Sequence, residues 1–128
     1  PGKKPAVCTS LVELLDLYPT VADLCGFPAP KNIQGTNFAS LLDDPTKKVH
    51  EEILCTSGSF GGTLLRTERY AYMRFAKKKQ QGELLYDLQK DPKQYTNLVD
   101  DPASQKALHA MRTRLDKKIA QVQKNDLQ

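Results

Sequence analysis

The stretch LLRTERYAYMRFAKKKQQGELLYDL, residues 64–88, decides the fold, because apolar and polar residues alternate along it with the period of β-strands. Together with the segment before it, this pattern predicts four strands, over residues 52–56, 64–66, 70–75 and 83–88. A tight turn at 67–69 and a longer one at 76–82 join the last three strands. Strands this close in sequence form an antiparallel meander.

A long amphipathic helix is predicted after the strands. Its apolar residues recur at steps of three or four: Leu108, Met111, Leu115, Ile119 and Val122. Asp101 can cap this helix, with Pro102 at its first position. Such a helix needs a sheet to cover, so the predicted fold class is α+β, a four-stranded antiparallel sheet packed by a long C-terminal helix.

A kinked helix is predicted near the N-terminus. Ser10 can begin it, with Glu13 completing a capping box. Pro19 interrupts the apolar face and forces the helix to end or kink near residues 16–18. Gly26 then ends the continuation of the helix in the left-handed conformation. A short helix is also expected at 37–42.

The composition argues against a disordered, collagen-like or coiled-coil protein. With 39% hydrophobic and 27% charged residues, the 128 residues are typical of one globular domain. No apolar run approaches the length of a membrane span, and we expect none. The net charge is +4, but the cations are interspersed with acids. The run Lys77–Lys79 is interpreted as a solvated turn, with phosphate or sulfate binding as the alternative. We expect no nucleic-acid partner.

Side chains with catalytic or metal-binding chemistry form no recognisable motif in this chain. There is no Gly-rich phosphate loop and no nucleophile elbow. His50 and His109 are interpreted as structural or solvated, because a metal site needs several ligands brought together. The acidic pairs at 43–44 and 100–101 each precede a proline, which favours turn or helix-end roles. From the residues alone, we expect no catalytic centre and no metal site.

Three cysteines, Cys8, Cys25 and Cys55, match no zinc or redox spacing. One disulfide with a free thiol and three buried thiols are both compatible with this number. We favour buried thiols, because Cys packs as a small apolar residue. The sequence does not establish the compartment.

Tyrosines and arginines on and near the predicted strands offer an alternative function. The set is Tyr70, Tyr72, Tyr86, Tyr95, Arg66, Arg69 and Arg74. These residues could form a stacking platform, which would make the chain a standalone α+β binding module for an anionic polymer. The simpler interpretation is that aromatic residues suit half-buried strands.

Three phrases in order carry a family resemblance. They are LVELLDLYPTVADLCGFPAP at 11–30, LLRTERYAYMRF at 64–75 and GELLYDLQKDPKQYTNLVDDP at 82–102. Together they resemble the C-terminal part of the sulfatases, in the alkaline-phosphatase-like superfamily, and within it the iduronate-2-sulfatase-related branch. The resemblance covers nearly the whole chain. It implies that residues 1–128 form a C-terminal subdomain whose N-terminal catalytic domain is absent, an expectation that also fits a first residue other than Met.

The resemblance implies that the parent chain hydrolyses sulfate esters, of a sulfated saccharide, using formylglycine and Ca²⁺. No cysteine here lies in the C-x-P-S-R or C-x-P-x-R motif, so this part is expected to hold no catalytic residue, metal or cofactor and to be inactive alone. Its partner would be the missing catalytic domain. Sulfatases are commonly exported, periplasmic or lysosomal.

Two features connect this subdomain with its expected neighbours. The Gly-rich loop 57–62 follows a strand, and we expect Ser59 or Phe60 in it to shape the rim of an anionic-sugar site. A subdomain should also expose an apolar face where the catalytic domain docks, around Leu11, Leu14 and Leu15. A standalone module should not.

Overall fold

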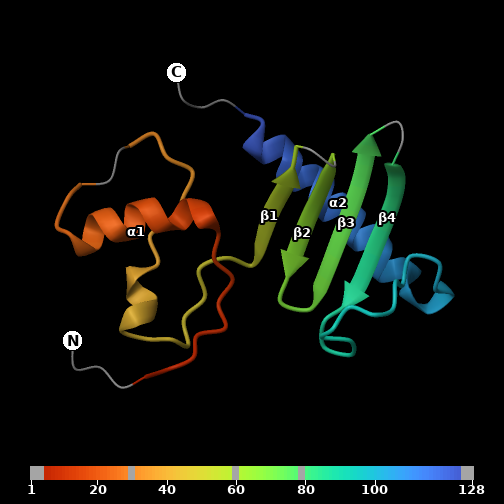
Figure 1. Cartoon of the computed structure of the whole chain (residues 1–128), viewed down its shortest axis with the longest axis horizontal. Helices are drawn as coiled ribbons and strands as arrows, with labels where there is room; N and C mark the ends of the chain where they lie inside the picture. The colour runs from red at the N-terminus through yellow and green to blue at the C-terminus, as the bar shows by residue number, and fades with distance from the viewer. Residues whose placement is uncertain (1–4, 29–30, 59–60, 78–79, 125–128) are drawn as a thin grey trace. The chain divides into compact units, whose positions relative to one another are not determined.

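The computed structural model describes residues 5–28, 31–58, 61–77 and 80–124 (Figure 1). The chain divides into two compact units, residues 1–53 and 54–128. The N-terminal unit contains the helices η1 (Leu14–Asp16), α1 (Leu17–Leu24) and η2 (Ala39–Leu42). The strand β1 (Glu52–Ser57) begins at the end of the first unit and continues into the second. The other elements of the second unit are β2 (Gly62–Thr67), β3 (Tyr70–Lys77), β4 (Gln80–Asp87), η3 (Pro102–Ser104) and α2 (Gln105–Val122).

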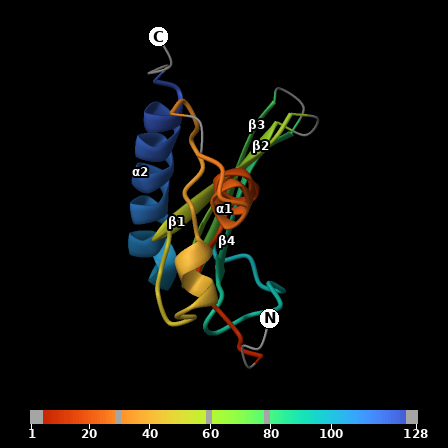
Figure 2. The same cartoon turned by 90° about the vertical axis from the view of Figure 1, so that its left-hand side faces the viewer.

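The second unit is a four-stranded antiparallel sheet with α2 on one face, as predicted (Figures 1 and 2). The strands lie in the order β1-β2-β3-β4. Leu65, Tyr72 and Leu85 are directly opposite one another on neighbouring strands and are fully buried. They pack against the apolar stripe of α2, formed by Leu108, Met111 and Leu115. Side-chain alternation along the strands therefore gives the sheet one face for the helix.

The hairpin between β3 and β4 is longer than predicted. Pairing continues to Lys77 opposite Gln80, so the turn expected over 76–82 is wrong for most of its length. Gly82, the last residue of the predicted turn, pairs with Phe75 inside the ladder. A glycine can weaken a strand without ending it, because its backbone still makes ladder hydrogen bonds. Residues 78–79 of the Lys77–Lys79 run lie outside the described residues.

The outer edge of β4 is capped by Asn97. Its side-chain oxygen accepts a hydrogen bond from the Leu85 amide at 2.9 Å, and its amide nitrogen donates to the Glu83 carbonyl at 3.3 Å. The Leu98 amide donates to the Leu85 carbonyl at 2.8 Å. The segment after β4 therefore satisfies backbone groups that an edge strand otherwise presents to solvent.

The start of the C-terminal helical segment confirms the prediction from sequence. The Asp101 side chain accepts a hydrogen bond from the Ala103 amide at 3.2 Å, and Pro102 is the first helical residue. The first turn is a 3₁₀ turn, η3, which leads into α2.

The N-terminal helix begins later than predicted. Leu11 pairs with His50 in an isolated antiparallel bridge, so Ser10 does not cap a helix. Its hydroxyl instead accepts a hydrogen bond from the Val49 amide at 2.9 Å. Glu13 is the residue before the 3₁₀ turn η1, which leads into α1. Pro19 lies in the first turn of α1, where its missing N–H has no intrahelical partner to lose.

Candidate functional site

The loop that the sequence suggested as a substrate rim joins β1 to β2. Ser59 and Phe60 lie outside the described residues, so their role stays a prediction. At the base of the loop, the Gly61 amide donates to the Ser57 carbonyl at 2.8 Å, and Gly61 has φ of 63°. A Cβ on Gly62 would come within 3.1 Å of the Phe75 ring. Both glycines therefore have a conformational or steric reason to be there.

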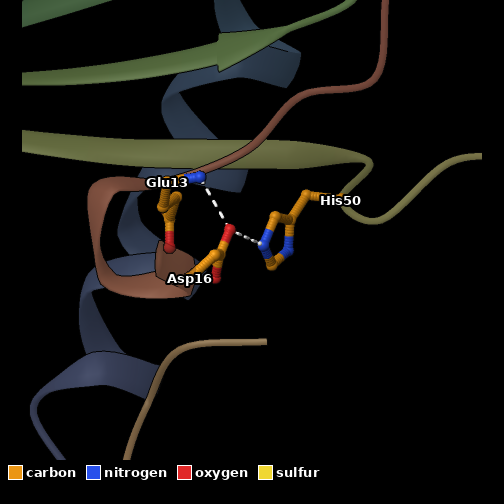
Figure 3. A group of neighbouring side chains, drawn as sticks. All are labelled: Glu13, Asp16 and His50. Carbon is orange, nitrogen blue, oxygen red and sulfur yellow. Dashed lines mark hydrogen bonds and ion pairs between the residues drawn. The ribbon is translucent and has the colours of Figure 1, made fainter. Parts of the chain in front are cut away.

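The Asp16 side chain of the N-terminal unit contacts both Glu13 and His50 (Figure 3), and the residue is fully buried. One carboxylate oxygen accepts a hydrogen bond from the Thr36 amide at 2.7 Å. The other accepts from the Glu13 amide at 2.7 Å and lies 2.8 Å from Nε2 of His50. Asp16 thus joins three segments that are distant in the chain.

These contacts decide the charge state of the carboxyl group. Burial on its own raises the pKa of Asp16, because it disfavours the charged form. The hydrogen bonds from the Thr36 and Glu13 amides, with His50, outweigh burial, so the pKa of Asp16 lies below its ordinary value. Asp16 is therefore a carboxylate at neutral pH, with the His50 ring 2.8 Å from one of its oxygens.

Glu13, Asp16 and His50 have ligand atoms within 4.8 Å of one another, which raises the question of a metal ion. Both oxygens of Asp16 already accept hydrogen bonds, two of them from backbone amides. Ca²⁺ takes six to eight oxygen ligands, whereas this group offers two carboxylates and an imidazole. The residues do not fit the Ca²⁺ that the sulfatase resemblance implies.

Helix α1 differs from an ordinary surface helix, because most of its large apolar side chains are exposed. Its buried residues are Pro19 and Thr20, directly after the buried Asp16. The Thr20 hydroxyl donates to the Asp16 carbonyl at 2.6 Å and accepts from the Phe38 amide at 3.0 Å. The side of the helix that carries Pro19 and Thr20 therefore faces the rest of its own unit.

The apolar side of this helical segment is exposed. Leu14 is 84% exposed and Leu15 56%, as expected for a docking face, whereas Leu11 is half-buried. The exposed set continues along the helix with Leu17, Tyr18, Val21, Leu24 and Phe27. We call Leu14, Leu15 and this set the α1 face. Several large apolar side chains exposed on one short segment are typical of an interface.

The structure does not assemble the tyrosine and arginine platform. Tyr72 is buried beneath α2, and Arg74 on the same face pairs with Asp116 of that helix at 2.8 Å. Arg66 and Tyr86 are both opposite Ala71 in the register, so they belong to the other face of the sheet. The aromatic strand residues mainly serve packing.

A polar cluster under α2 was missed by the sequence analysis. The Tyr72 hydroxyl donates to a Glu83 carboxylate oxygen, and the Arg112 guanidinium donates to both Glu83 oxygens. Burial, followed by the Glu83 contact, raises the pKa of Tyr72 to about 12. The alternation of side chains along the strands could have indicated this cluster, because it places Tyr72 and Glu83 on the face of the sheet that α2 covers.

The remaining candidate residues have separate roles. His109 is exposed on α2. Asp44 accepts a hydrogen bond from the Thr46 amide at 3.0 Å, and Asp101 caps the last helical segment, as the adjacent prolines suggested. None of these residues lies in the cluster around Asp16.

Burial of the cysteines was predicted wrongly. Cys8, Cys25 and Cys55 are free and exposed. Cys25 is the C-terminal cap residue of α1, and Cys55 lies on the outermost strand of the sheet. Positions at element ends and edges leave side chains in solvent regardless of their preference for the interior.

Comparison with known proteins identifies the family. Residues 1–121 match the family described as "N-sulphoglucosamine sulphohydrolase, C-terminal". A Δ4,5-hexuronate-2-O-sulfatase from Bacteroides thetaiotaomicron is 34% identical over 121 residues, which cover 89% of this chain and 25% of that protein. An arylsulfatase from Clostridium perfringens is 28% identical, over 92% of this chain and 24% of that protein.

Solved structures agree with this assignment. The structure of a 2-O GAG sulfatase superposes with a TM-score of 0.71 at 33% identity, covering 87% of this chain and 25% of that one. The chain thus spans about a quarter of the length of the relatives it matches. The sulfatase resemblance seen in the sequence is confirmed, and the chain belongs to the C-terminal domain family of the sulfatases.

Proposed function

We propose that this chain is the C-terminal portion of a sulfuric-ester hydrolase that removes sulfate from a sulfated saccharide. Two of its relatives carry the names hexuronate-2-O-sulfatase and 2-O GAG sulfatase, which supports both the ester and the saccharide class. The formylglycine and Ca²⁺ would be held by residues outside these 128. Alone, the chain is inactive, because its cysteines lack the required motif and its carboxylate cluster does not fit Ca²⁺.

The α1 face is the single observation that supports this role for the chain. A helix that buries Asp16 and Thr20 while Leu14, Tyr18 and Val21 remain in solvent needs a covering partner. We assign that partner as the catalytic domain of the same protein, because the sulfatase relatives are about four times as long as the matched region. The same face disfavours the alternative of a standalone module for anionic polymers.

The loop 57–62 is assigned to the rim of the substrate site, with Ser59 or Phe60 beside the anionic sugar. Support comes from its position on a rigid sheet, since loops on such scaffolds often bind ligands. Deleting Ser59–Gly61 in the full-length enzyme should raise KM for the saccharide substrate. An unchanged KM would remove the loop from the site.

Activity is tested on the full-length protein, produced with a formylglycine-generating enzyme. Sulfate release is measured from 4-methylumbelliferyl sulfate and from a panel of 2-O-, 6-O- and N-sulfated disaccharides. We expect release from at least one saccharide, and none from residues 1–128 alone. Hydrolysis of matched phosphate esters in place of all sulfate esters would contradict the proposal.

A further inference from the structure

The turn after β4 presents an aromatic ring to solvent. Tyr95 is 80% exposed, more than any other aromatic side chain in the described part of the chain. Nothing in its own unit requires a tyrosine there, since the buried cluster is formed by other residues. Exposed tyrosine on a loop is favourable for recognition, because the ring offers a large contact area with few rotatable bonds.

The backbone holds this ring in a defined place. The Asp91 side chain accepts a hydrogen bond from the Thr96 amide at 2.8 Å, and the Asp91 carbonyl accepts from the Gln94 amide at 3.1 Å. Asn97 attaches the end of the segment to β4. The turn is therefore fixed at both ends although its side chains are exposed.

Gln94, directly before the tyrosine, adopts φ of 58°, the left-handed region that favours glycine. No other non-glycine residue in the described ranges has a positive φ. Residues in such conformations are concentrated at functional sites, where the surrounding structure maintains them.

A cation accompanies the ring. The Lys93 ammonium lies 6.0 Å from the centroid of Tyr95, within reach of a cation–π contact. Lys90 adds a second exposed cation to the same turn, so the two ammonium groups outnumber the Asp91 carboxylate, which keeps its negative charge while it accepts a hydrogen bond from the Thr96 amide. An apolar ring face beside ammonium groups is complementary to a sugar ring that carries a sulfate.

We propose that Tyr95 and Lys93 form a secondary binding site for a sulfated saccharide chain, with a sugar ring stacked on Tyr95 and a sulfate paired with Lys93. This inference rests on the proposed function, which supplies the ligand class. The site would hold a polymeric substrate at a second point and so would favour long chains over short ones.

Binding of a heparin octasaccharide to the full-length protein tests the site, by titration calorimetry at low and physiological salt. We expect Tyr95→Ala and Lys93→Ala each to weaken binding at least about fivefold. Tyr95→Phe keeps the ring and should bind within about twofold of the wild type. Lys117→Ala removes another exposed cation, on α2, and serves as the control for charge.

Several results would overturn the site. They are equal binding by the wild type and Tyr95→Ala, loss in Lys117→Ala as large as in Lys93→Ala, or no binding by the wild type. Undiminished binding of a desulfated octasaccharide would exclude the sulfate contact. Equal, Tyr95-dependent binding of an oligoglutamate would assign the site to acidic peptides instead.

Failure of this site and failure of the proposed function are distinguishable. Hydrolysis of 4-methylumbelliferyl sulfate depends on the sulfatase activity and not on Tyr95, so the variants should cleave it at the wild-type rate. Wild-type turnover with unaltered octasaccharide binding in the variants contradicts only the secondary site. Absence of all sulfate release contradicts the function, whatever the binding result.

Discussion

Asp16 is the residue that holds the N-terminal unit together. Its carboxylate satisfies the amides of Glu13 and Thr36 and positions the ring of His50, 34 residues away in sequence. A buried carboxylate is costly unless hydrogen bonds compensate for lost hydration. Here they more than compensate, which is why the pKa of Asp16 falls.

Substitution of Asp16 tests this role. Asp16→Asn should lower the free energy of unfolding at pH 7 by about 2–3 kcal/mol, because an amide cannot accept the same set of hydrogen bonds. Since the folded-state pKa of Asp16 is lowered, its contribution is present above the ordinary value of 3.8 and is lost as pH falls through the folded value. Urea unfolding across pH 3–7 measures the difference. Asp23→Asn, at an exposed carboxylate on the following helix α1, is the control and should change stability by less than about 0.5 kcal/mol.

The raised pKa of Tyr72 predicts that the folded protein loses stability in alkali. Its folded pKa of about 12 exceeds the ordinary value of 10.0, so the unfolded state loses the phenolic proton first. The resulting contribution is present below pH 10 and is lost as pH rises through 12, by an amount on the order of 2 kcal/mol. Tyr72→Phe should flatten this decline in unfolding curves between pH 9 and 12. Tyr95→Phe, at an exposed ring, should leave the slope as it is in the wild type.

At the scale of elements, the cap on β4 explains part of the phrase that identified the family. Asn97 in the sequence QYTNL bonds both Leu85 and Glu83 of the strand. Its short amide side chain offers one acceptor and one donor on the same plane, which matches the alternating groups of a strand edge.

Loss of this cap should destabilise the sheet unit. Asn97→Ala removes the contacts to the Leu85 amide and Glu83 carbonyl and should cost about 1–2 kcal/mol in the free energy of unfolding. Asn97→Asp keeps the acceptor and should cost less. Urea titration followed by circular dichroism measures both variants. Equal stability of Asn97→Ala and wild type would show that water replaces the cap without loss.

Local patterns predicted the elements better than the contacts between them. Alternation over 70–75 predicted β3, and steps of three and four predicted α2, because both periods are set by neighbouring residues. The Asp16–His50 contact depends on how an intervening loop closes, which no local period encodes. A sequence signal was present nonetheless, since Asp16 and Thr20 are an i, i+4 polar pair in the apolar segment LLDLYPTVADL. The prediction that Ser10 caps a helix is wrong, because its hydroxyl accepts a hydrogen bond from the distant Val49 amide and not from a helical amide.

For the whole protein, the α1 face determines what the C-terminal portion requires. We expect the surface of the catalytic domain as the partner of the α1 face. No helix in the described ranges is long and apolar enough to cross a membrane. Replacing a leucine in a covered interface by a charge leaves that charge without water.

The docking interface can be tested with Leu14→Glu in the full-length protein. If the catalytic domain covers the 84% exposed Leu14, this change should destabilise the protein by about 2–4 kcal/mol or lower its soluble yield. Asp23→Lys changes charge at an exposed polar position of the same helix and should have little effect on thermal unfolding. If Leu14→Glu melts at the same temperature as the wild type, the catalytic domain does not cover the α1 face.

The Asn97 cap also limits how copies of this protein can associate. A bare outer strand is the template on which partly unfolded chains add their own segments, the first step toward fibrils. Along β4 the positions at Leu85 and Glu83 are already occupied from within the molecule. Intermolecular growth of the sheet on that side would first have to displace the protein's own polypeptide, which makes this border resistant to amyloid-like stacking.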